Sequence, residues 1–277
     1  MKKIYILLPV HNRKEITKKF VLCLKAQTFQ NYHLILIDDG STDGTKEMVR
    51  EYIESLTVLT GKGNWWWAGS LQQGYQWLRT NNISLSDLVL IINDDTEFET
   101  DFLERGYNLL DALSQTLLFA KGYDKETHQL VEDGYSLDWK HFRFDSTSNP
   151  DEINCLSTRG LFFRVSDFYK IGGFHPKLLP HYISDYEFTI RAHKKGMKLI
   201  THSSLYVLVD DKQTGYHQFE SDSLFVFLKK YFSRKSSANP IHWTIFIAMT
   251  CPWPWKFANW CRIWYNTMRL ICKHLFN

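Results

Sequence analysis

The feature of this sequence that most constrains its fold is a series of short apolar segments, each followed by a polar loop and then by residues at helical spacing. Ile4–Leu8, Leu34–Ile37 and Leu88–Ile92 are nearly unbroken apolar runs of strand length. A strand that is apolar on both faces is typical of a sheet with helices on both sides. Apolar residues recur at helical spacing in Glu15–Leu24, directly after the first loop. The sequence therefore predicts an α/β fold with a doubly wound sheet.

The same alternation continues along the chain. Asp43 or Thr45 can cap a helix after the second apolar run, and Leu56–Leu59 has the composition of a third strand. A helix is expected from about Gly69–Leu78. Between Thr116–Val165 the pattern is mixed and rich in turns, which favours strands added at the sheet edge and loops around a second pocket.

Composition argues against several classes of protein. The net charge is only +3 and no basic stretch dominates the predicted α/β part, so a nucleic-acid-binding protein is not expected. The five cysteines are scattered without a CxxC pair, which argues against a disulfide framework or a zinc site. The first apolar run ends at Pro9, too soon for a signal peptide. We therefore expect a cytoplasmic protein.

Polar residues follow three of the predicted strands. They form the loops Pro9–Arg13, Asp38–Asp43 and Asn93–Asp95. In open α/β sheets, ligands bind at the carboxyl ends of the strands. An acidic pair there can accept hydrogen bonds from a base or a ribose, and an acidic cluster can hold a hard cation between diphosphate oxygens. Sugar transfer from a nucleotide diphosphate uses both devices.

Five segments carry a resemblance to a known family. The segments are Leu8–Arg13, Ile37–Asp43, Ile92–Thr96, Gly172–Phe174 and Ser184–Arg191. In these segments, and in their order along roughly Lys3–Asp211, the chain resembles family 2 of the inverting glycosyltransferases. The resemblance implies a GT-A-like, doubly wound mixed sheet and transfer of a sugar from a UDP- or dTDP-sugar to a hydroxyl of a lipid-linked bacterial surface glycan.

The resemblance also implies roles for residues in the first three loops. Pro9, His11 and Asn12 would line the nucleotide pocket, and Asp39 would contact a pyrimidine base. Asp94 would face the ribose or a phosphate.

The metal site follows the same resemblance. Asp95 takes the place of the acid that binds Mg²⁺ or Mn²⁺ in this family. The element begins with Asn93 instead of an acid, which removes one charge from the site. Asp210 and His217 are alternatives for a further metal ligand.

Asp185 corresponds to the general base of the family. Its usual acidic neighbour is here Ser184, and Glu187 should face elsewhere because neighbouring positions of a helix point in different directions. An isolated Asp at this place could equally be a helix cap.

The run Trp65–Trp67 places three tryptophans in a row, and they cannot all face a core. Asn64 and Gly69 lie where related transferases place a loop beside the donor. An indole there, such as that of Trp66, can pack against a sugar or a base. The run resembles a subgroup that includes bacterial transferases of deoxyhexoses such as rhamnose.

The C-terminal part has a different character, so we divide the chain into a glycosyltransferase domain (1–220) and a helical segment (221–277), with Ser233–Pro240 as a linker. This segment is rich in Trp, Lys and Arg and contains one acid, Asp222. Such a composition suits a helix on an anionic membrane surface, at the inner face of the cell membrane. The alternative is that the aromatic residues pack on the core or on a second subunit of a homodimer.

Two other functions remain to be distinguished. A nucleotidyltransferase should carry a Gly-rich, basic loop after the first strand, and Pro9–Arg13 does not resemble one. A non-catalytic glycan- or nucleotide-sugar-binding module would have the same fold but form no product.

Overall fold

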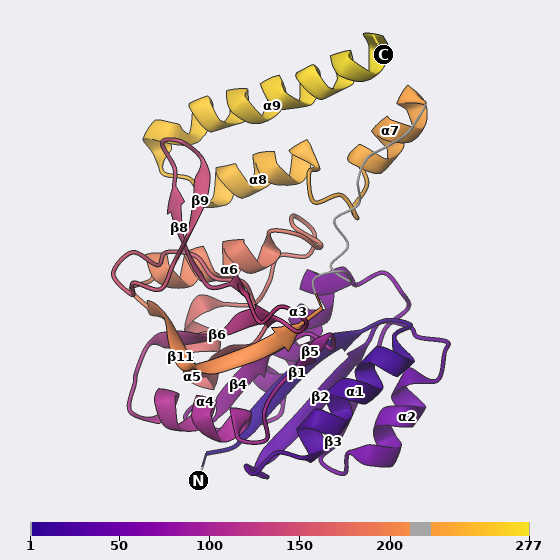
Figure 1. Cartoon of the computed structure of the whole chain (residues 1–277), viewed down its shortest axis with the longest axis vertical. Coiled ribbons are helices and arrows are strands. Elements are labelled where there is room, and N and C mark those ends of the chain that lie inside the picture. The colour runs from indigo at the N-terminus through magenta and orange to yellow at the C-terminus, as the bar shows by residue number, and fades with distance from the viewer. Residues whose placement is uncertain (1, 211–222, 277) are drawn as a thin grey trace.

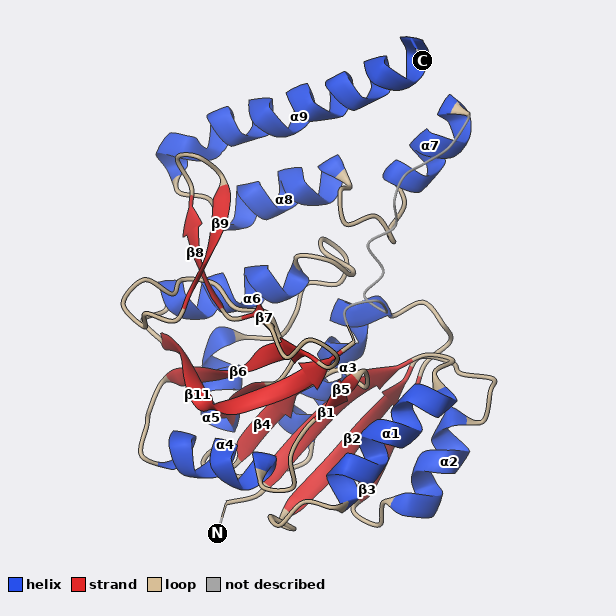
Figure 2. Cartoon of the chain, in the orientation of Figure 1, coloured by secondary structure: helices blue, strands red, loops and turns tan. Residues whose placement is uncertain are grey.

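The structure, a computed structural model, describes residues 2–210 and 223–276. A twisted sheet lies between two layers of helices, and further helices lie above one end of this α/β body (Figure 1). Figure 2 shows the same arrangement by secondary structure. The mixed α/β architecture confirms the predicted fold class.

The main sheet has the strand order β3-β2-β1-β4-β10-β6-β11-β5, with β7 paired to β6. Strands β1 to β4 are parallel, and β10 runs antiparallel to both β4 and β6. A separate hairpin is formed by β8 and β9. The strands are β1 (Ile4–Val10), β2 (Tyr32–Asp38), β3 (Leu56–Thr60), β4 (Leu88–Ile91), β5 (Thr96–Glu97), β6 (Thr116–Asp124), β7 (Leu130–Glu132), β8 (Gly134–Asp138), β9 (Arg143–Thr147), β10 (Leu161–Arg164) and β11 (Lys198–Val209).

Two apolar cores cover the two faces of the sheet. Helices α1, α2 and α4 contribute to one core, and α3, α5 and α6 contribute to the other. This accounts for strands that are apolar on both sides. The helices of the α/β body are α1 (Lys14–Lys25), α2 (Thr45–Tyr52), α3 (Trp66–Thr80), α4 (Phe102–Asp111), α5 (Val165–Ile171) and α6 (Ser184–Lys194).

Two details differ from the sequence-based expectation. The strands expected at the sheet edge between residues 116 and 165 include β10, which lies inside the sheet because Leu161–Phe163 is fully buried between its neighbours. Helix α3 begins at Trp66, earlier than the expected Gly69. The backbone N–H groups at this end of the helix have a partner in Asp39, which stabilises the extra turn.

The C-terminal helices are α7 (Leu224–Tyr231), α8 (Pro240–Thr250) and α9 (Trp253–Phe276). Phe246 and Ile247 of α8 share a third apolar core with Ile190 of α6 and Leu137 of β8. Asn259 of α9 donates a hydrogen bond to a carbonyl of the β8–β9 hairpin. The C-terminal helices therefore pack on the α/β body. Among the described residues, no helix is both long and apolar enough to cross a bilayer.

Candidate active site

Two cavities meet at the carboxyl ends of β1, β2 and β4. The first has a volume of about 510 Å³ and the second of about 500 Å³. Trp67, Asn93, His181 and Tyr182 line both. The two cavities are therefore halves of one cleft, in the place where an open α/β sheet binds its ligands.

The loop after β1 forms one wall of the first cavity. Pro9 and His11 line the cavity, and their role in binding a nucleotide stays a prediction. The Nδ1 atom of His11 lies 2.7 Å from the carbonyl oxygen of Asp39, which orients the ring. Asn12, in the same loop, is not among the residues that line the cavity. Its Oδ1 accepts a hydrogen bond of 2.8 Å from the N–H of Thr42. Asn12 thus joins the first two strand-end loops.

Asp39 lines the first cavity and also organises its floor. Its Oδ1 accepts hydrogen bonds from the N–H groups of Gly63 (2.8 Å) and Asn64 (3.1 Å). Its Oδ2 accepts from Trp65 (2.7 Å) and Trp66 (3.1 Å). One buried carboxylate thereby holds four successive amides at the start of α3. In this structure, the contact between Asn64 and the site is through its backbone.

The three tryptophans divide between the core and the cleft. Trp65 packs against the apolar core, Trp66 lines the first cavity, and Trp67 lines both cavities. Trp66 has a φ of 58°, a left-handed conformation that is unusual for a bulky residue. The hydrogen bond from the Trp66 N–H to Asp39 stabilises this conformation, in which the indole lines the cavity. This placement meets the expectation that not all three can be buried.

Asp94 and Asp95 follow β4 and share one guanidinium. Arg13 Nε lies 3.3 Å from Asp94 Oδ1, and Arg13 Nη2 lies 3.2 Å from Asp95 Oδ2. Thr17 donates a hydrogen bond of 2.8 Å to Asp94 Oδ2. Burial nevertheless raises the pKa of Asp94 to about 6, against the lowering effects of Arg13 and Thr17. Arg13 is a site residue to which the sequence analysis gave no role.

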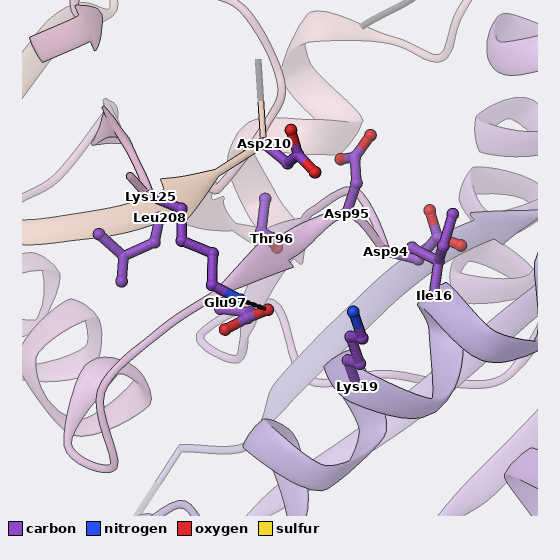
Figure 3. A pocket seen from close by; sticks show the side chains of 9 residues that line it. All are labelled: Ile16, Lys19, Asp94, Asp95, Thr96, Glu97, Lys125, Leu208 and Asp210. Carbon is purple, nitrogen blue, oxygen red and sulfur yellow. Dashed lines mark hydrogen bonds and ion pairs between the residues drawn. The ribbon is translucent and has the colours of Figure 1, made fainter. Parts of the chain in front are cut away.

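A small cavity of about 50 Å³ lies beside these acids (Figure 3). Asp94, Asp95, Glu97 and Asp210 line it. The Oδ1 atom of Asp95 is buried and has no hydrogen-bond partner within the described residues. An unpartnered buried carboxylate oxygen fits a hard divalent cation, which prefers oxygen ligands.

The remaining metal ligands are not assembled in the described part of the chain. Within residues 2–210 and 223–276, no group of three or more His, Cys, Asp or Glu side chains is arranged to hold a metal. The predicted ligand His217 lies outside the described residues. The predicted alternative, Asp210, lines the small cavity together with Asp95.

Asp185 lies in the first turn of α6 and lines the second cavity. Its Oδ1 accepts a hydrogen bond of 2.9 Å from the N–H of Tyr186. Burial raises the pKa of Asp185 to about 6, and Glu132 adds to this effect while Arg159 opposes it. The residue before this helix turn, Ile183, has a φ of 60°, which is rare for a β-branched residue. A half-buried carboxylate with a raised pKa, in a cleft, is typical of a proton acceptor in catalysis.

Comparison with known families decides the classification of the chain. The family model described as glycosyl transferase family 2 matches residues 5–169. This match covers more than half of the chain and includes the first three strand-end loops. The chain belongs to glycosyl transferase family 2.

Individual relatives are distant. Glycosyltransferase AglE of Haloferax volcanii is 26% identical over 120 residues, which are 41% of this family 2 chain and 37% of AglE. The matched stretch is thus little more than a third of that relative.

Solved structures agree with this fold. The mannosyltransferase PcManGT of Pyrobaculum calidifontis, in complex with GDP-Man and Mn²⁺, has a TM-score of 0.60 at 14% identity, and the match covers 96% of this chain and 75% of that one. S. aureus TarS 1–349, in complex with UDP-GlcNAc, has a TM-score of 0.59 at 16% identity and coverage of 90% and 71%. The fold of this family 2 protein is therefore GT-A-like.

Two other residues of the segment that contains Asp185, Glu187 and Arg191, stabilise the fold. Glu187 is buried and forms an ion pair with Arg191, with a distance of 2.8 Å between Oε1 and Nε. The Arg191 guanidinium donates hydrogen bonds to the carbonyls of Ile171 (2.7 Å) and Gly173 (2.8 Å). Glu187 therefore faces away from the cavity, as predicted, and holds the loop after α5 against α6.

Sequence reasoning missed His181 as a site residue. His181 lines both cavities, and its Nδ1 is buried without a hydrogen-bond partner within the described residues. Burial lowers its pKa to about 4, with smaller effects from Lys235 and His242. The ring is thus neutral at physiological pH. No motif singled out this histidine, although it lies four residues before Asp185.

The C-terminal segment completes the walls of the cleft. Lys235 lines the first cavity, and Ser237, Ala238 and Trp243 line the second. The sequence analysis had treated the stretch around Ser233–Pro240 only as a linker. Its site role could not be read from the sequence because the stretch has turn composition and is distant from the other site residues.

Proposed function

We propose that this family 2 protein is an inverting glycosyltransferase that moves a sugar from a UDP- or dTDP-sugar to an acceptor hydroxyl. The observation that carries the proposal is a single cleft with two unlike ends. One end has the strand-end loops and Asp94, which shares Arg13 with the neighbouring Asp95, and the other has Asp185 with a raised pKa. PcManGT with GDP-Man and TarS with UDP-GlcNAc support a nucleotide-sugar donor.

In this proposal the donor nucleotide occupies the first cavity and the acceptor enters the second. Asp185 accepts the proton of the acceptor hydroxyl. The acceptor oxygen then forms a bond to the anomeric carbon, and the bond from that carbon to the diphosphate oxygen breaks with its electron pair remaining on the diphosphate. Attack from the face opposite the leaving group inverts the anomeric centre. A positioned base of this kind contributes about 10²–10⁴-fold to the rate.

A divalent cation, Mg²⁺ or Mn²⁺, would complete the donor site. Asp95 is the proposed ligand because its Oδ1 is buried without a partner, and Asp210 or His217 would be a further ligand. When bound, the cation would neutralise negative charge on the diphosphate. The structure of PcManGT in complex with GDP-Man and Mn²⁺ supports such a requirement.

The proposed acceptor is a lipid-linked glycan of the cell surface, and the protein would bind peripherally at the inner face of the cell membrane. The support is one face of α9, where exposed apolar residues recur at helical spacing. The helix also carries basic residues, and the sequence after Asp222 contains no acid. This pattern suits an interfacial helix on anionic lipid. The exposed apolar residues of this face include Trp253, Phe257, Trp264, Met268 and Leu275, and the basic residues of the helix include Arg262, Arg269 and Lys273.

Flotation with liposomes tests the membrane part of the proposal. The full chain should float with anionic vesicles and not with neutral ones. The double substitution Trp253→Ser and Phe257→Ser should abolish flotation, because both side chains are at least 75% exposed and do not support the core. Leu85→Ser, which changes an exposed apolar residue elsewhere, is the matched control. A wild-type chain that stays at the bottom with anionic vesicles contradicts this assignment.

A panel of nucleotide sugars tests the activity. The purified chain should release nucleoside diphosphate from one donor class in the presence of Mn²⁺, and the sugar product should have the opposite anomeric configuration by NMR. Retention of configuration would contradict the assignment of Asp185 as a base for direct displacement. Binding of nucleotide sugars without any product, with acceptor extract present, would favour a non-catalytic binding module.

A further inference from the structure

One basic side chain from the C-terminal helices reaches the first cavity. Lys235 lies in the loop between α7 and α8, and it lines the cavity together with Arg13, Trp66 and His181. Its Nζ lies 5.8 Å from the centroid of the Trp66 ring. Within residues 2–210 and 223–276, Lys235 forms no ion pair with a carboxylate. Its charge is therefore not neutralised by a neighbouring acid of the described chain.

The loop that carries Lys235 is held in place at both ends. Asn239 is buried, and its Oδ1 accepts hydrogen bonds from the first N–H groups of α8. Its Nδ2 donates to the carbonyls of Phe232 (2.9 Å) and Ser233 (3.0 Å), before Lys235. Trp243 Nε1 donates to the carbonyl of Ser237 (2.9 Å), after it. The position of the Lys235 backbone is thus set by the fold of the C-terminal segment.

Arg13, the other cationic side chain of the first cavity, has acidic partners. Arg13 contacts both Asp94 and Asp95, so its charge is balanced by the protein itself. The Asp39 carboxylate is likewise balanced by four backbone N–H groups. Lys235 is the cationic side chain lining this cavity that has no acidic partner among the described residues. Such a cation at the mouth of a cavity is suited to bind an anionic ligand.

We propose that Lys235 binds the phosphate groups of the donor and stabilises the charge of the departing diphosphate. This inference rests on the proposed function, because that function places a nucleotide diphosphate in the first cavity. When the bond between the anomeric carbon and the diphosphate oxygen breaks, the electron pair stays on the diphosphate. The Lys235 ammonium then interacts with a group whose negative charge has increased, which lowers the barrier. The cation–π contact with Trp66 holds the ammonium at the cavity before the donor binds.

The proposal has a consequence for the organisation of the chain. The segment after residue 222 would contribute to donor binding as well as to any membrane contact. Attachment of α9 to a surface and occupation of the donor site would therefore involve the same small group of helices. The division at residue 220 would then separate regions of different composition and not regions of different function.

Calorimetry with UDP, dTDP and GDP in the presence of Mn²⁺ tests the proposal, using the diphosphate that the wild-type chain binds best. Lys235→Ala should weaken its binding by about tenfold or more, as expected for loss of a charged contact, while affinity for the corresponding nucleoside stays unchanged. Lys235→Arg should keep most of the affinity. Arg234→Ala is the matched control, since Arg234 is the neighbouring basic residue of the same loop and does not line the cavity.

The possible outcomes distinguish the role of Lys235 from the proposed function. If the wild-type chain binds none of the three diphosphates, the proposed function and this inference both fail. If it binds one of them and Lys235→Ala binds it equally well, only the role of Lys235 is wrong. Equal losses for diphosphate and nucleoside would also contradict the inference, because they would show a general change in the cavity. The difference between wild type and Lys235→Ala should shrink at high salt.

Discussion

The two cavities of the cleft are built in opposite ways. In the first, Asp39 accepts four backbone hydrogen bonds, and Arg13 links the two acids after β4. In the second, the Asp185 carboxylate accepts a hydrogen bond from the N–H of Tyr186, and its pKa is raised by burial. The first cavity has a preformed, hydrogen-bonded frame suited to binding. The second keeps a carboxylate in a less favourable surrounding, which suits a reacting group.

The largest expected effect concerns the reacting end. Asp185→Asn keeps the shape and the bond from Tyr186 but removes the base, so turnover should fall by about 10²–10⁴-fold. Donor affinity, measured by calorimetry, should stay close to wild type. The control is Glu132→Gln, which changes the other acid of the second cavity. If that substitution abolishes turnover and Asp185→Asn does not, Glu132 is the base, and the assignment of Asp185 as the reacting group of the second cavity is wrong.

The next effect concerns the proposed metal site beside Asp95. Asp95→Ala removes the carboxylate with the unpartnered buried oxygen, so the gain in nucleoside diphosphate affinity on adding Mn²⁺ should fall by at least about tenfold. Calorimetry with and without Mn²⁺ measures this gain. Glu97→Gln, at another acid of the small cavity that is ion-paired with Lys125, should leave it nearly unchanged. An unaltered Mn²⁺ effect in Asp95→Ala would show that the cation, if any, binds elsewhere.

A smaller effect should distinguish residues that only stabilise the fold from residues that also support nucleotide binding. Asp39→Asn turns an amide N–H group or a weaker acceptor toward the four amides at the start of α3. It should lower the free energy of unfolding by about 1–3 kcal/mol and also weaken nucleotide binding. Asp43→Asn is the matched control, because Asp43 accepts backbone N–H groups of Lys14 and Thr45 outside the cavity. It should reduce stability in urea without reducing nucleotide affinity. Equal losses of nucleotide affinity in both variants would mean that the hydrogen bonds of Asp39 are no more important for binding than those of Asp43, outside the cavity.

The smallest effect is on the dependence of stability on pH. The pKa of Asp185 is raised from 3.8 to about 6, so the folded protein holds this proton more tightly than the unfolded chain. The free energy of unfolding should therefore decrease as pH rises between these two values. At pH 8, Asp185→Asn should be more stable than wild type by about 1–2 kcal/mol, a figure reduced for the partial exposure of the side chain.

Urea unfolding at pH 4 and pH 8 measures this difference. Kinetics offer a second measure, because kcat/KM should rise with pH through an apparent pKa near that of Asp185 and then level off. A wild-type profile that is flat between pH 5 and pH 8 would contradict a base with a pKa of about 6.

Much of the fold could be predicted from particular residues. Ile4–Leu8, Leu34–Ile37 and Leu88–Ile92 have the apolar pattern of buried parallel strands, and they became β1, β2 and β4. Strand β10 was not placed correctly. Leu161–Phe163 is as apolar as the other strands, but its antiparallel insertion between β4 and β6 depends on pairing with distant residues.

The site was predictable where chemistry follows directly after a strand. Asp39, Asp94 and Asp95 were singled out this way, and they lie together because loops at the ends of parallel strands meet at one edge of the sheet. His181 and Lys235 were missed, because each belongs to a loop whose course is set by packing between helices. The sequence could not decide between Asp38 and Asp39 in the acidic pair. In the structure Asp38 is fully buried, whereas Asp39 lines the first cavity. Strand alternation turns neighbouring side chains to opposite faces, and the sequence alone does not say which face holds the ligand.

The sequence by itself determined the family, the α/β alternation and the identity of the acids, because these depend on local periodicity and on residue type at strand ends. Only the tertiary structure decided what surrounds each acid. Asp39 is anchored to the amides of Gly63–Trp66, Asp94 and Asp95 share Arg13, and Asp185 is desolvated beside Tyr186. The physical reason is that a carboxylate's pKa and hydrogen bonds depend on burial and on partners distant in the sequence, and these are set only when the chain packs.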